Sequence, residues 1–304
     1  MKCRKCGEKA VIKLYQHNLA LCKKHFLEFI EERVKKTIHD FQMFEKEDNI
    51  LVAVSGGKDS LALSYLLHKL GYSISLLHID LGIDGYSDNS RRISENFAQK
   101  FKLPLRIISL REEWGGGIKD FSRKTYKSVC SLCGMVKRYY FNKTAYEKGM
   151  DVIATGHNLD DMVSALLSNL LGWRTSYIVK QLPVLPEEGK LKKKVKPLIY
   201  LTEREIGAYT FLSGISFLRE ECPYSREASF LRVKHLLNQI EISSPGTKFT
   251  FYRGFLENLH LFQKEERKVN LNDCLLCGFP TISKVCSFCK TFRREKIEEY
   301  AGKI

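Results

Sequence analysis

The stretch LVAVSGGKDSLALSYLLHKLG, residues 51–71, decides the fold. Its apolar start ends at Val54, and a helical pattern of leucines later leads to Gly71. Between them lies a run without large apolar side chains, Ser55-Gly56-Gly57-Lys58-Asp59-Ser60. Glycines let backbone N–H groups turn inward, the start of a helix adds partial positive charge, and Lys58 adds a full charge. The stretch therefore predicts a phosphate-binding loop between a strand and a helix.

Strands and helices alternate around this loop. Four apolar segments predict strands, at 50–54, 74–79, 105–109 and 151–155. Helical periodicity covers about 29–44, and Ser-Ser-Pro-Gly-Thr at 243–247 predicts a break before a helix over 248–265. This alternation predicts an α/β fold with a doubly wound parallel sheet, in which ligands bind beyond the carboxyl ends of the strands.

The composition restricts the kind of protein. The chain has 304 residues, a formal net charge of +15 and a sequence pI of about 9.3. This balance favours a polyanionic partner, and a surface of solvated lysines is the alternative. No apolar run approaches the roughly 18 residues that span a bilayer, and the N-terminus lacks the apolar core of a signal peptide. We therefore expect a cytoplasmic protein with no membrane partner, whose thiols stay reduced.

Paired cysteines stand at both ends of the chain. Four soft or borderline ligands in two closely spaced pairs suit a tetrahedral structural Zn2+, and buried cysteines without metal are the alternative. The first set is Cys3, Cys6, Cys22 and His25, and the second is Cys274, Cys277, Cys286 and Cys289. The pattern predicts a zinc finger over 1–28, a main domain over 29–270 and a second zinc finger over 271–304.

Three of the ten cysteines remain: Cys130, Cys133 and Cys222. Three thiolates are too few to close a structural zinc site. They could hold a catalytic zinc ion, form a disulfide or persulfide pair, or bind an iron–sulfur cluster with one iron left open. Their position along the chain places them in the main domain rather than in a terminal module.

The phosphate-binding loop resembles that of a known family. It is not of the Walker type, because G-x-x-x-x-G-K-[ST] would require a glycine where the chain has Val52. SGGKDS instead resembles the pyrophosphate loop of the N-type ATP pyrophosphatases, which split ATP into AMP and pyrophosphate. In that family the backbone at the end of the second strand, here LLHID, reads adenine. The resemblance implies an ATP site formed by Ala53, Ser55, Gly56, Gly57, Lys58, Asp59, Ser60, Ile79, Asp80, Lys137, Gly156 and Asp161.

ATGHNLDD, residues 154–161, ends another predicted strand and opens a helix. It places Gly156 against the nucleotide and two carboxylates at the helix start, where the helix dipole stabilises negative charge. We expect an N-cap role for Asp160, contact with ATP or Mg2+ for Asp161, and a packing role rather than that of a base for His157.

CSLCGMVKR, residues 130–138, is a further motif of this kind. It sets Lys137 and Arg138 one helical turn beyond Cys133, close enough to face the phosphate of an adenylate. A solvated helix face is the alternative for these two cations.

Motifs along nearly the whole chain resemble those of the two-thiouridine synthetase (TtuA) group of tRNA 2-thiolation enzymes. They are the two terminal cysteine sets, SGGKDS, CxxCGxxKR, GHNxDD and ECPYS at 221–225. The resemblance implies that ATP adenylates the C2 oxygen of a tRNA uridine and that sulfur then displaces AMP. An amide-like carbonyl oxygen is a poor leaving group until it becomes a phosphate ester.

The resemblance also implies which groups carry the reaction. The catalytic residues would be Lys58, Lys137, Asp161, Cys130 and Cys222. Lys58, Lys137 and Mg2+ would offset charge on the phosphates. Three cysteines, the third of them Cys133, would hold a [4Fe-4S] cluster whose open iron binds a hydrosulfide. The cofactors would be ATP, Mg2+, this cluster and two Zn2+, and the partners tRNA, a ubiquitin-like thiocarboxylate carrier or free sulfide, and a second copy in a homodimer.

Alternatives stay open at this point. Cys130 and Cys222 could act without metal, one carrying a persulfide and the other releasing it, which would leave Cys133 idle. Overall similarity inclines towards tRNA uridine 54 as the target, with wobble uridine 34 and cytidine 32 as alternatives. An amide-forming or ammonia-using enzyme on the same fold would not need the three thiols. A non-enzymatic zinc-ribbon RNA binder would leave SGGKDS unexplained.

Two segments have no assigned role in this scheme. Lys190–Lys196 is most simply a solvated loop, and a tRNA-contacting loop is the alternative. Gly115–Gly117 is interpreted as a mobile lid or as an ordinary flexible surface loop.

Overall fold

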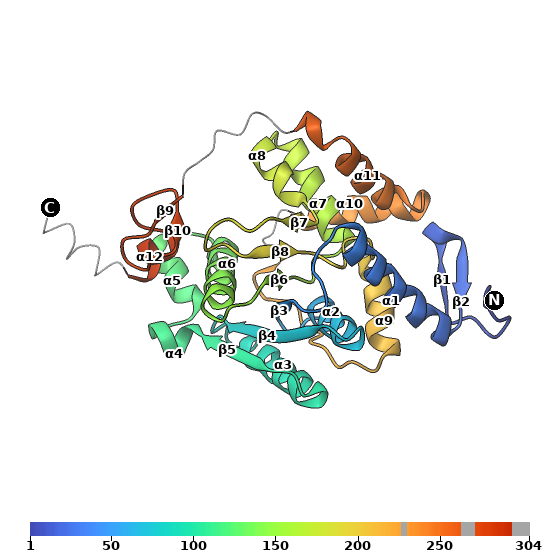
Figure 1. The fold of residues 1–304 in the computed structure, drawn as a ribbon. Helices are drawn as coiled ribbons and strands as arrows, with labels where there is room; N and C mark the ends of the chain where they lie inside the picture. Colours follow the sequence, from blue (N-terminus) through green and yellow to red (C-terminus); the bar gives the residue numbers. More distant parts are fainter. Residues whose placement is uncertain (226–229, 263–270, 294–304) are drawn as a thin grey trace, which may run out of the picture.

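A six-stranded sheet forms the centre of the computed structural model, which describes residues 1–225, 230–262 and 271–293 (Figure 1). The strand order is β5-β4-β3-β6-β8-β7. The strands are β3 Asn49–Val54, β4 Ser73–Asp80, β5 Leu105–Ser109, β6 Val152–Ala154, β7 Val184–Leu185 and β8 Lys193–Val195. All neighbouring pairs are parallel except β7 with β8. The expected α/β fold and its four expected strands are confirmed.

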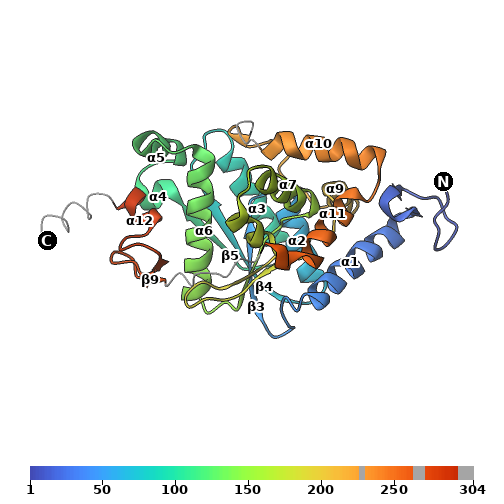
Figure 2. The ribbon, with the colours of Figure 1, turned by 90° about the horizontal axis from the view of Figure 1, so that it is seen from above.

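Alternate residues of β3 enter two different hydrophobic cores, and this explains why the strand is apolar almost throughout. Ile50, Val52 and Val54 pack on one face of the sheet, whereas Leu51 packs on the other. The first face is covered by α1 Lys23–Asp40, α2 Lys58–Lys69, α3 Ser87–Phe101 and α9 Glu203–Leu212. The second is covered by α5 Ile118–Thr125, α6 Val129–Glu147 and α12 Ser287–Phe292 (Figure 2). The sheet is therefore doubly wound.

A third hydrophobic cluster lies beyond β6. It joins α7 Leu159–Leu171 to α10 Phe230–Ser243 and α11 Thr247–Glu257. The break expected near 243–247 separates α10 from α11. The helix expected over 248–265 is shorter, because α11 gives way to η4 Leu259–Leu261, and residues 263–265 lie outside the described residues. The remaining short elements are α4 Leu110–Trp114, α8 Thr175–Ile178 and η2 Val179–Gln181.

The two terminal modules lie at opposite ends of the molecule (Figure 1). The N-terminal module is a hairpin of β1 Ile12–Leu14 and β2 Leu19–Leu21, joined by η1 Tyr15–His17. The C-terminal module contains β9 Asn272–Asp273, β10 Pro280–Thr281 and α12.

The first long helix is displaced from its expected position of 29–44. It begins at Lys23, directly after Cys22, whose extended backbone makes it the N-cap. It ends at Asp40, and Gln42 takes a positive φ of 46°, which a continuing helix does not allow.

Lys190–Lys196 is not the solvated loop that its composition indicated. Its centre is β8, in which Val195 is fully buried and pairs with the neighbouring strands. The Lys196 side chain is buried, and its ammonium donates to two backbone carbonyls of the α8–β7 region. Lys190 pairs with Asp273 of the C-terminal module at 2.7 Å. Carbonyl and carboxylate groups of the protein therefore already contact the ammonium groups of Lys190 and Lys196.

Aromatic rings attach the C-terminal module to the main domain. Phe288 of α12 stacks on Tyr139 of α6 with ring centroids 3.7 Å apart, and Phe292 lies 4.4 Å from Phe121 of α5. Trp114 meets the edge of Phe288 at 5.6 Å. The module thus packs against the helix whose first turns carry two of the three remaining cysteines.

Among the described residues, no helix combines the length and the apolar character that crossing a membrane requires.

Replacing Phe288 by alanine should lower the free energy of unfolding by about 3 kcal/mol, because it removes a ring that is 2% exposed from a packed aromatic cluster. Urea denaturation followed by tryptophan fluorescence measures this change, since Trp114 adjoins the ring. Phe211→Ala is the matched control, because Phe211 is 75% exposed, and should have an effect below about 0.5 kcal/mol. Equal effects would contradict the packing described here.

Candidate functional site

The loop between β3 and α2 is held in place by a close backbone contact. Gly56 has a φ of +70°, and a Cβ atom at this position would meet the Ser90 carbonyl oxygen of α3 at 2.8 Å. Only glycine satisfies both conditions without strain. The Ser90 hydroxyl also donates to the Ser55 carbonyl at 2.8 Å. The chain after β3 is therefore fastened to the start of α3.

Hydroxyl groups stabilise the loop from within. The Ser60 hydroxyl donates to the Gly57 carbonyl at 3.0 Å and accepts from the Ser55 N–H at 3.2 Å. α2 then starts at Lys58, so the first N–H groups of the helix have no partner within the helix. A helix start of this kind binds anions, as the sequence indicated.

A second glycine brings the β6–α7 connection against the same loop. A Cβ atom at Gly156 would lie 2.9 Å from the Asp59 carbonyl carbon and 2.9 Å from the Ser60 nitrogen. The segments that follow β3 and β6 are consequently in contact at the carboxyl edge of the sheet. Gly156 therefore packs against the phosphate loop and also lines the cavity beside it.

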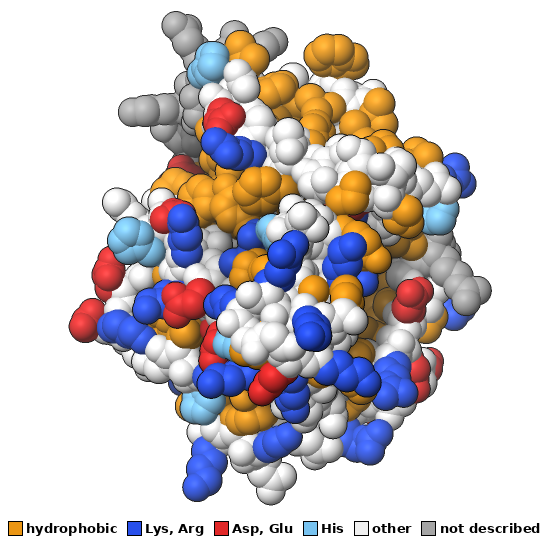
Figure 3. Space-filling model, turned by 90° about the vertical axis from the view of Figure 1, so that its right-hand side faces the viewer, with side chains coloured by type: hydrophobic (Ala, Val, Ile, Leu, Met, Phe, Trp, Pro, Cys, Tyr) orange, Lys and Arg blue, Asp and Glu red, His pale blue; other side chains and the backbone are white. Residues whose placement is uncertain are grey.

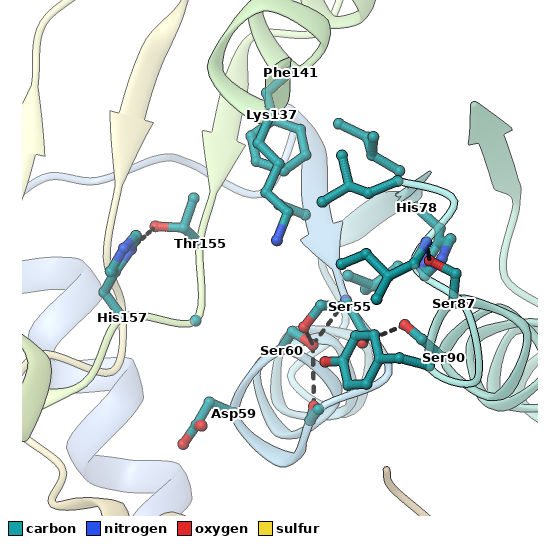
Figure 4. Close-up of a pocket in the computed structure, with 18 of the residues that line it drawn as sticks. Ser55, Asp59, Ser60, His78, Ser87, Ser90, Lys137, Phe141, Thr155 and His157 are labelled. Carbon is teal, nitrogen blue, oxygen red and sulfur yellow. Dashed lines mark hydrogen bonds between the residues drawn. The ribbon is translucent and has the colours of Figure 1, made fainter. Parts of the chain in front are cut away.

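The cavity at this edge of the sheet has a volume of about 320 Å³ (Figure 4). This is at the lower end of the range for small-molecule pockets. It brings together residues that the sequence assigned to ATP: Ala53, Ser55, Gly57, Asp59, Ser60, Ile79, Lys137, Gly156 and Asp161. Gly56, Lys58 and Asp80 are not on its wall. Asp80 is buried at the end of β4, and its carboxylate accepts from the Gly82 N–H at 2.8 Å.

Lys137 supplies the positive charge inside the cavity. Figure 4 shows its side chain extending from α6 towards Ser55 and Ser60 of the phosphate loop. On the β4 side, burial lowers the pKa of His78 to about 4, so this imidazole is neutral at physiological pH. Its Nδ1 lies 3.1 Å from the Ser94 hydroxyl. Lys137 is therefore the cation best placed to meet a phosphate in this cavity.

The wall also contains residues that the sequence did not assign to the site: Val54, His78, Leu81, Ile83, Tyr86, Ser87, Ser90, Phe141 and Thr155, together with His157, for which a packing role was expected. One signal for them was present, since Ser87, Ser90 and Ser94 recur at helical spacing on the buried face of α3. Small side chains on that face let α3 approach the loop. The Thr155 hydroxyl lies 2.8 Å from His157 Nδ1, which gives His157 a local polar partner beside the pocket rather than only a packing role.

Lys58 is not on the cavity wall and takes part in an ion-pair network. Its ammonium lies 2.5 Å from Glu203 Oε1 and 3.1 Å from Asp59 Oδ2. Lys234 of α10 bridges Glu203 Oε2 at 2.7 Å and Asp161 Oδ1 at 3.4 Å. Burial alone would lower the pKa of Lys58, but Asp59 and Glu203 raise it, so Lys58 stays charged.

One of the two aspartates of GHNLDD has a different role from the one expected. Asn158 is the N-cap of α7, and it forms a capping box with Asp161. Asp160 is instead buried in an ion pair with Lys248 and accepts from the Glu203 N–H at 2.7 Å. The N-cap role expected for Asp160 is therefore wrong. Asp161 both caps the helix and lines the cavity, where burial raises the pKa of its carboxyl and Lys234 opposes this shift.

Two of the three remaining cysteines border the same hydrophobic cluster as part of the cavity wall. Cys133 and Cys222 pack against this cluster, and so does Tyr86, a cavity-wall residue. The Cys130 thiol lies 3.4 Å from the Tyr224 carbonyl, so the start of α6 contacts the segment that carries Cys222. In the described residues, these thiols do not gather as tightly as the two terminal sets do. A cluster spreads its thiolates over separate irons, so a wider spacing fits it better than a single ion.

The two terminal sets gather as the sequence predicted. In each, the four ligand atoms lie within 4.8 Å of one another. His25 Nδ1 lies 3.3 Å from the Cys22 sulfur and 3.5 Å from the Cys3 sulfur. Gly7 and Gly278, which follow the first pair of each set, have φ values of +77° and +65°. Both arrangements therefore suit one tetrahedral metal ion each.

Gly115–Gly117 joins α4 to α5. A Cβ atom at Gly117 would lie 2.4 Å from the Gly82 carbonyl oxygen. The Ile118 N–H also donates to the Leu81 carbonyl at 2.8 Å. The Gly117 end of the segment is therefore packed against the loop after β4, which forms one wall of the cavity. This close packing does not fit a lid that hinges at Gly117.

Comparison with known families agrees with this geometry. A PP-loop domain family matches residues 27–239, and the N-terminal LIM domain family of the 2-thiouridine synthetase TtuA matches residues 2–27. A tRNA-5-methyluridine(54) 2-sulfurtransferase of Pyrococcus horikoshii is 46% identical, over 97% of this chain and 95% of the relative. The enzyme of the same name from Thermotoga maritima is 43% identical, over 100% of this chain and 99% of the relative.

A solved structure has the same fold over almost the whole chain. The U34-tRNA thiolase NcsA from Methanococcus maripaludis, solved with its [4Fe-4S] cluster, aligns with a TM-score of 0.82 at 25% identity. The alignment covers 97% of this chain and 96% of that one. With a PP-loop domain over most of its length and the N-terminal domain of the 2-thiouridine synthetases in front of it, the chain belongs to the PP-loop family, in the group of tRNA 2-thiolation enzymes.

Proposed function

We propose that this protein is an ATP-dependent sulfurtransferase that converts a tRNA uridine, the 5-methyluridine at position 54, to its 2-thio form. One observation carries the proposal: the phosphate-binding loop and the cation Lys137 line one cavity, and Cys133 and Cys222 border the same hydrophobic cluster as Tyr86 of the cavity wall. The names of the relatives support position 54 over position 34 or cytidine 32. An amide-forming enzyme on the same fold would have no use for the three cysteines.

The first half-reaction activates the base. ATP would lie along the carboxyl edge of the sheet, with its adenine at Ile79 and Asp80 and its phosphates on the loop N–H groups from Ser55 to Ser60. The C2 oxygen of uridine attacks the α-phosphorus, and pyrophosphate leaves. Lys137 inside the cavity and Lys58 at its edge would offset the charge that develops on the phosphates.

Asp161 is the candidate carboxylate for the Mg2+ that accompanies ATP. It lines the cavity, and it is anchored by the Asn158 N–H at 3.3 Å. Carboxylate oxygens are the ligands that Mg2+ prefers, and the ion would usually keep several waters.

The second half-reaction replaces the activated oxygen by sulfur. Cys130, Cys133 and Cys222 would hold a [4Fe-4S] cluster, which fits their thiol chemistry and their number. Cys133 and Cys222 border the same hydrophobic cluster as Tyr86 of the cavity wall, and Cys130 contacts the Tyr224 carbonyl. When bound, the cluster would supply an iron with an open position for a hydrosulfide. The competing scheme uses a persulfide on Cys130 or Cys222 and leaves Cys133 without a role.

The terminal modules would each bind one Zn2+ and gain folding free energy from it. We include in the proposal a cytoplasmic location, as some relatives are named cytoplasmic tRNA 2-thiolation protein. A ubiquitin-like thiocarboxylate carrier or free sulfide as sulfur donor, and a homodimer, complete the scheme that the family resemblance implies.

Positive charge on the surface supports tRNA as the substrate. Lys and Arg side chains are spread over the lower part of the face that carries the N-terminal module (Figure 3). Together with the net charge of +15, they favour a polyanion, and binding should weaken steeply as salt rises.

Lys58→Ala and Asp161→Asn should reduce thiolation of tRNA at least 100-fold, because each removes a charge needed at the ATP phosphates. Asparagine keeps an oxygen that can accept from the Asn158 N–H, so the capping box survives. The measurement is 2-thiouridine by mass spectrometry of digested tRNA, with pyrophosphate release followed with and without tRNA. Lys69→Ala is the control, since Lys69 ends the same helix and pairs with Glu31 on the surface. Undiminished turnover in either test variant would refute the role given to that residue.

Cys133→Ala should abolish thiolation and the absorption and EPR signals of a cluster after anaerobic reconstitution with iron and sulfide. Under the persulfide scheme this variant would keep its activity, so its turnover decides between the two. Elemental analysis of a variant lacking Cys130, Cys133 and Cys222 should find no iron but close to two zinc ions per chain, because the terminal sets are untouched. Loss of zinc in that variant would show that the metal assignment is wrong.

A further inference from the structure

The lysine of the phosphate loop is paired with protein carboxylates rather than directed at the site of the phosphates. Lys58 Nζ contacts Glu203 Oε1 at 2.5 Å and Asp59 Oδ2 at 3.1 Å. Lys58 does not line the cavity, although Gly57, Asp59 and Ser60 on either side of it do. A phosphate that approaches this ammonium therefore has to compete with Glu203 and Asp59 for it.

Glu203 is held firmly in the position where it meets Lys58. It is the first residue of α9, directly after the N-cap Thr202, and its own N–H donates to Asp160 Oδ2 at 2.7 Å. Its second carboxylate oxygen is fixed by Lys234 at 2.7 Å. A negative charge at the start of a helix is stabilised by the helix dipole. The carboxylate is thus preset and does not depend on Lys58 for its own position.

The charge of Glu203 is permanent under physiological conditions. Burial would raise its pKa, but the ammonium groups of Lys234 and Lys58 hold it down at about 2. Protonation therefore does not release Lys58. Only a competing anion can do so.

The local balance of charge opposes the arrival of a nucleotide. Among the described residues, the ion pairs named above join two ammonium groups, Lys58 and Lys234, to three carboxylates, Asp59, Asp161 and Glu203. Three negative charges against two positive charges leave an excess of one negative charge. ATP adds more negative charge at the same edge of the sheet, so its binding gains attraction if Lys58 turns from Glu203 to the phosphates.

We propose that Glu203 is a positioning residue that competes with the phosphates of ATP for Lys58, and so holds this lysine outside the cavity until a nucleotide arrives. Lys234 keeps Glu203 in place after Lys58 has left, so the exchange needs only a rotation of the Lys58 side chain. This inference rests on the proposed binding of ATP at the loop. The opposite role, in which Glu203 aims Lys58 at the phosphates, predicts the opposite sign for the effect of removing its charge.

Isothermal titration of the Glu203→Gln variant with ATP tests whether removing the charge of Glu203 strengthens or weakens ATP binding. The competition predicts that ATP binds about three- to tenfold more tightly to this variant than to the wild type, because a partly exposed ion pair no longer has to be broken. Adenosine, which has no phosphate, should bind equally to both proteins. Glu203→Ala serves as a second variant and should show the same direction. Equal or weaker binding of ATP would overturn the inference.

Two further proteins separate competition for Lys58 from a general loss of negative charge. Glu220→Gln removes an exposed carboxylate whose partner is Asn89 of α3, and it should leave ATP affinity unchanged. In a Lys58→Met background, Glu203→Gln should have no further effect, since the two residues act through one contact. If Glu203→Gln strengthens ATP binding equally in that background, the effect is general electrostatics and the proposal fails. If the wild type itself does not bind ATP, the proposed function fails instead.

Discussion

The site depends on the close approach of three backbone segments at one edge of the sheet. Gly56 admits the Ser90 carbonyl of α3, and Gly156 admits the first residues of α2, in both cases at distances that leave no room for a side chain. The loop after β3 is consequently held between α3 and the connection after β6. The cavity lies at the carboxyl ends of the strands, where open α/β sheets bind their ligands. A larger side chain at either glycine would force these segments apart.

Charge is distributed around this edge in two groups. Lys137 lies inside the cavity, whereas Lys58 and Lys234 lie among Asp59, Asp161 and Glu203. A buried or half-buried ion pair contributes little net stability, because the cost of removing both charges from water offsets their attraction. Such a network is therefore better understood as a means of fixing where each charge stands. It connects the phosphate loop to α7, α9 and α10, which come from distant parts of the chain.

The sequence alone predicted those features whose residues lie close together in the chain. The strand–loop–helix of residues 51–71 and the two terminal cysteine sets were all predicted from spacing, because each is determined by residues close together in the chain. The parallel sheet followed from alternation of apolar segments.

Contacts between distant residues escaped prediction. Nothing near Lys58 in the chain indicates that Glu203 is one of its partners. Lys190–Lys196 was predicted to be a solvated loop because lysines dominate its composition, whereas it contains a short strand in which Val195 is buried. The cap of α7 was misassigned for a related reason, since Asn158 and Asp160 are both good N-cap residues. Only the pairing of Asp160 with Lys248 shows which of them caps the helix.

The central claim is that ATP activates the base by forming a bond to its C2 oxygen at this cavity. The most direct test uses tRNA whose target uridine carries 18O at C2, incubated with the reconstituted protein, ATP, Mg2+ and sulfide. If the oxygen is adenylated and then displaced by sulfur, the 18O must leave in the phosphate of AMP, in equal amount to the 2-thiouridine formed. Mass spectrometry of the nucleotides would then find one labelled oxygen in AMP. Unlabelled AMP accompanied by 2-thiouridine, or label released into water or pyrophosphate, would contradict this account.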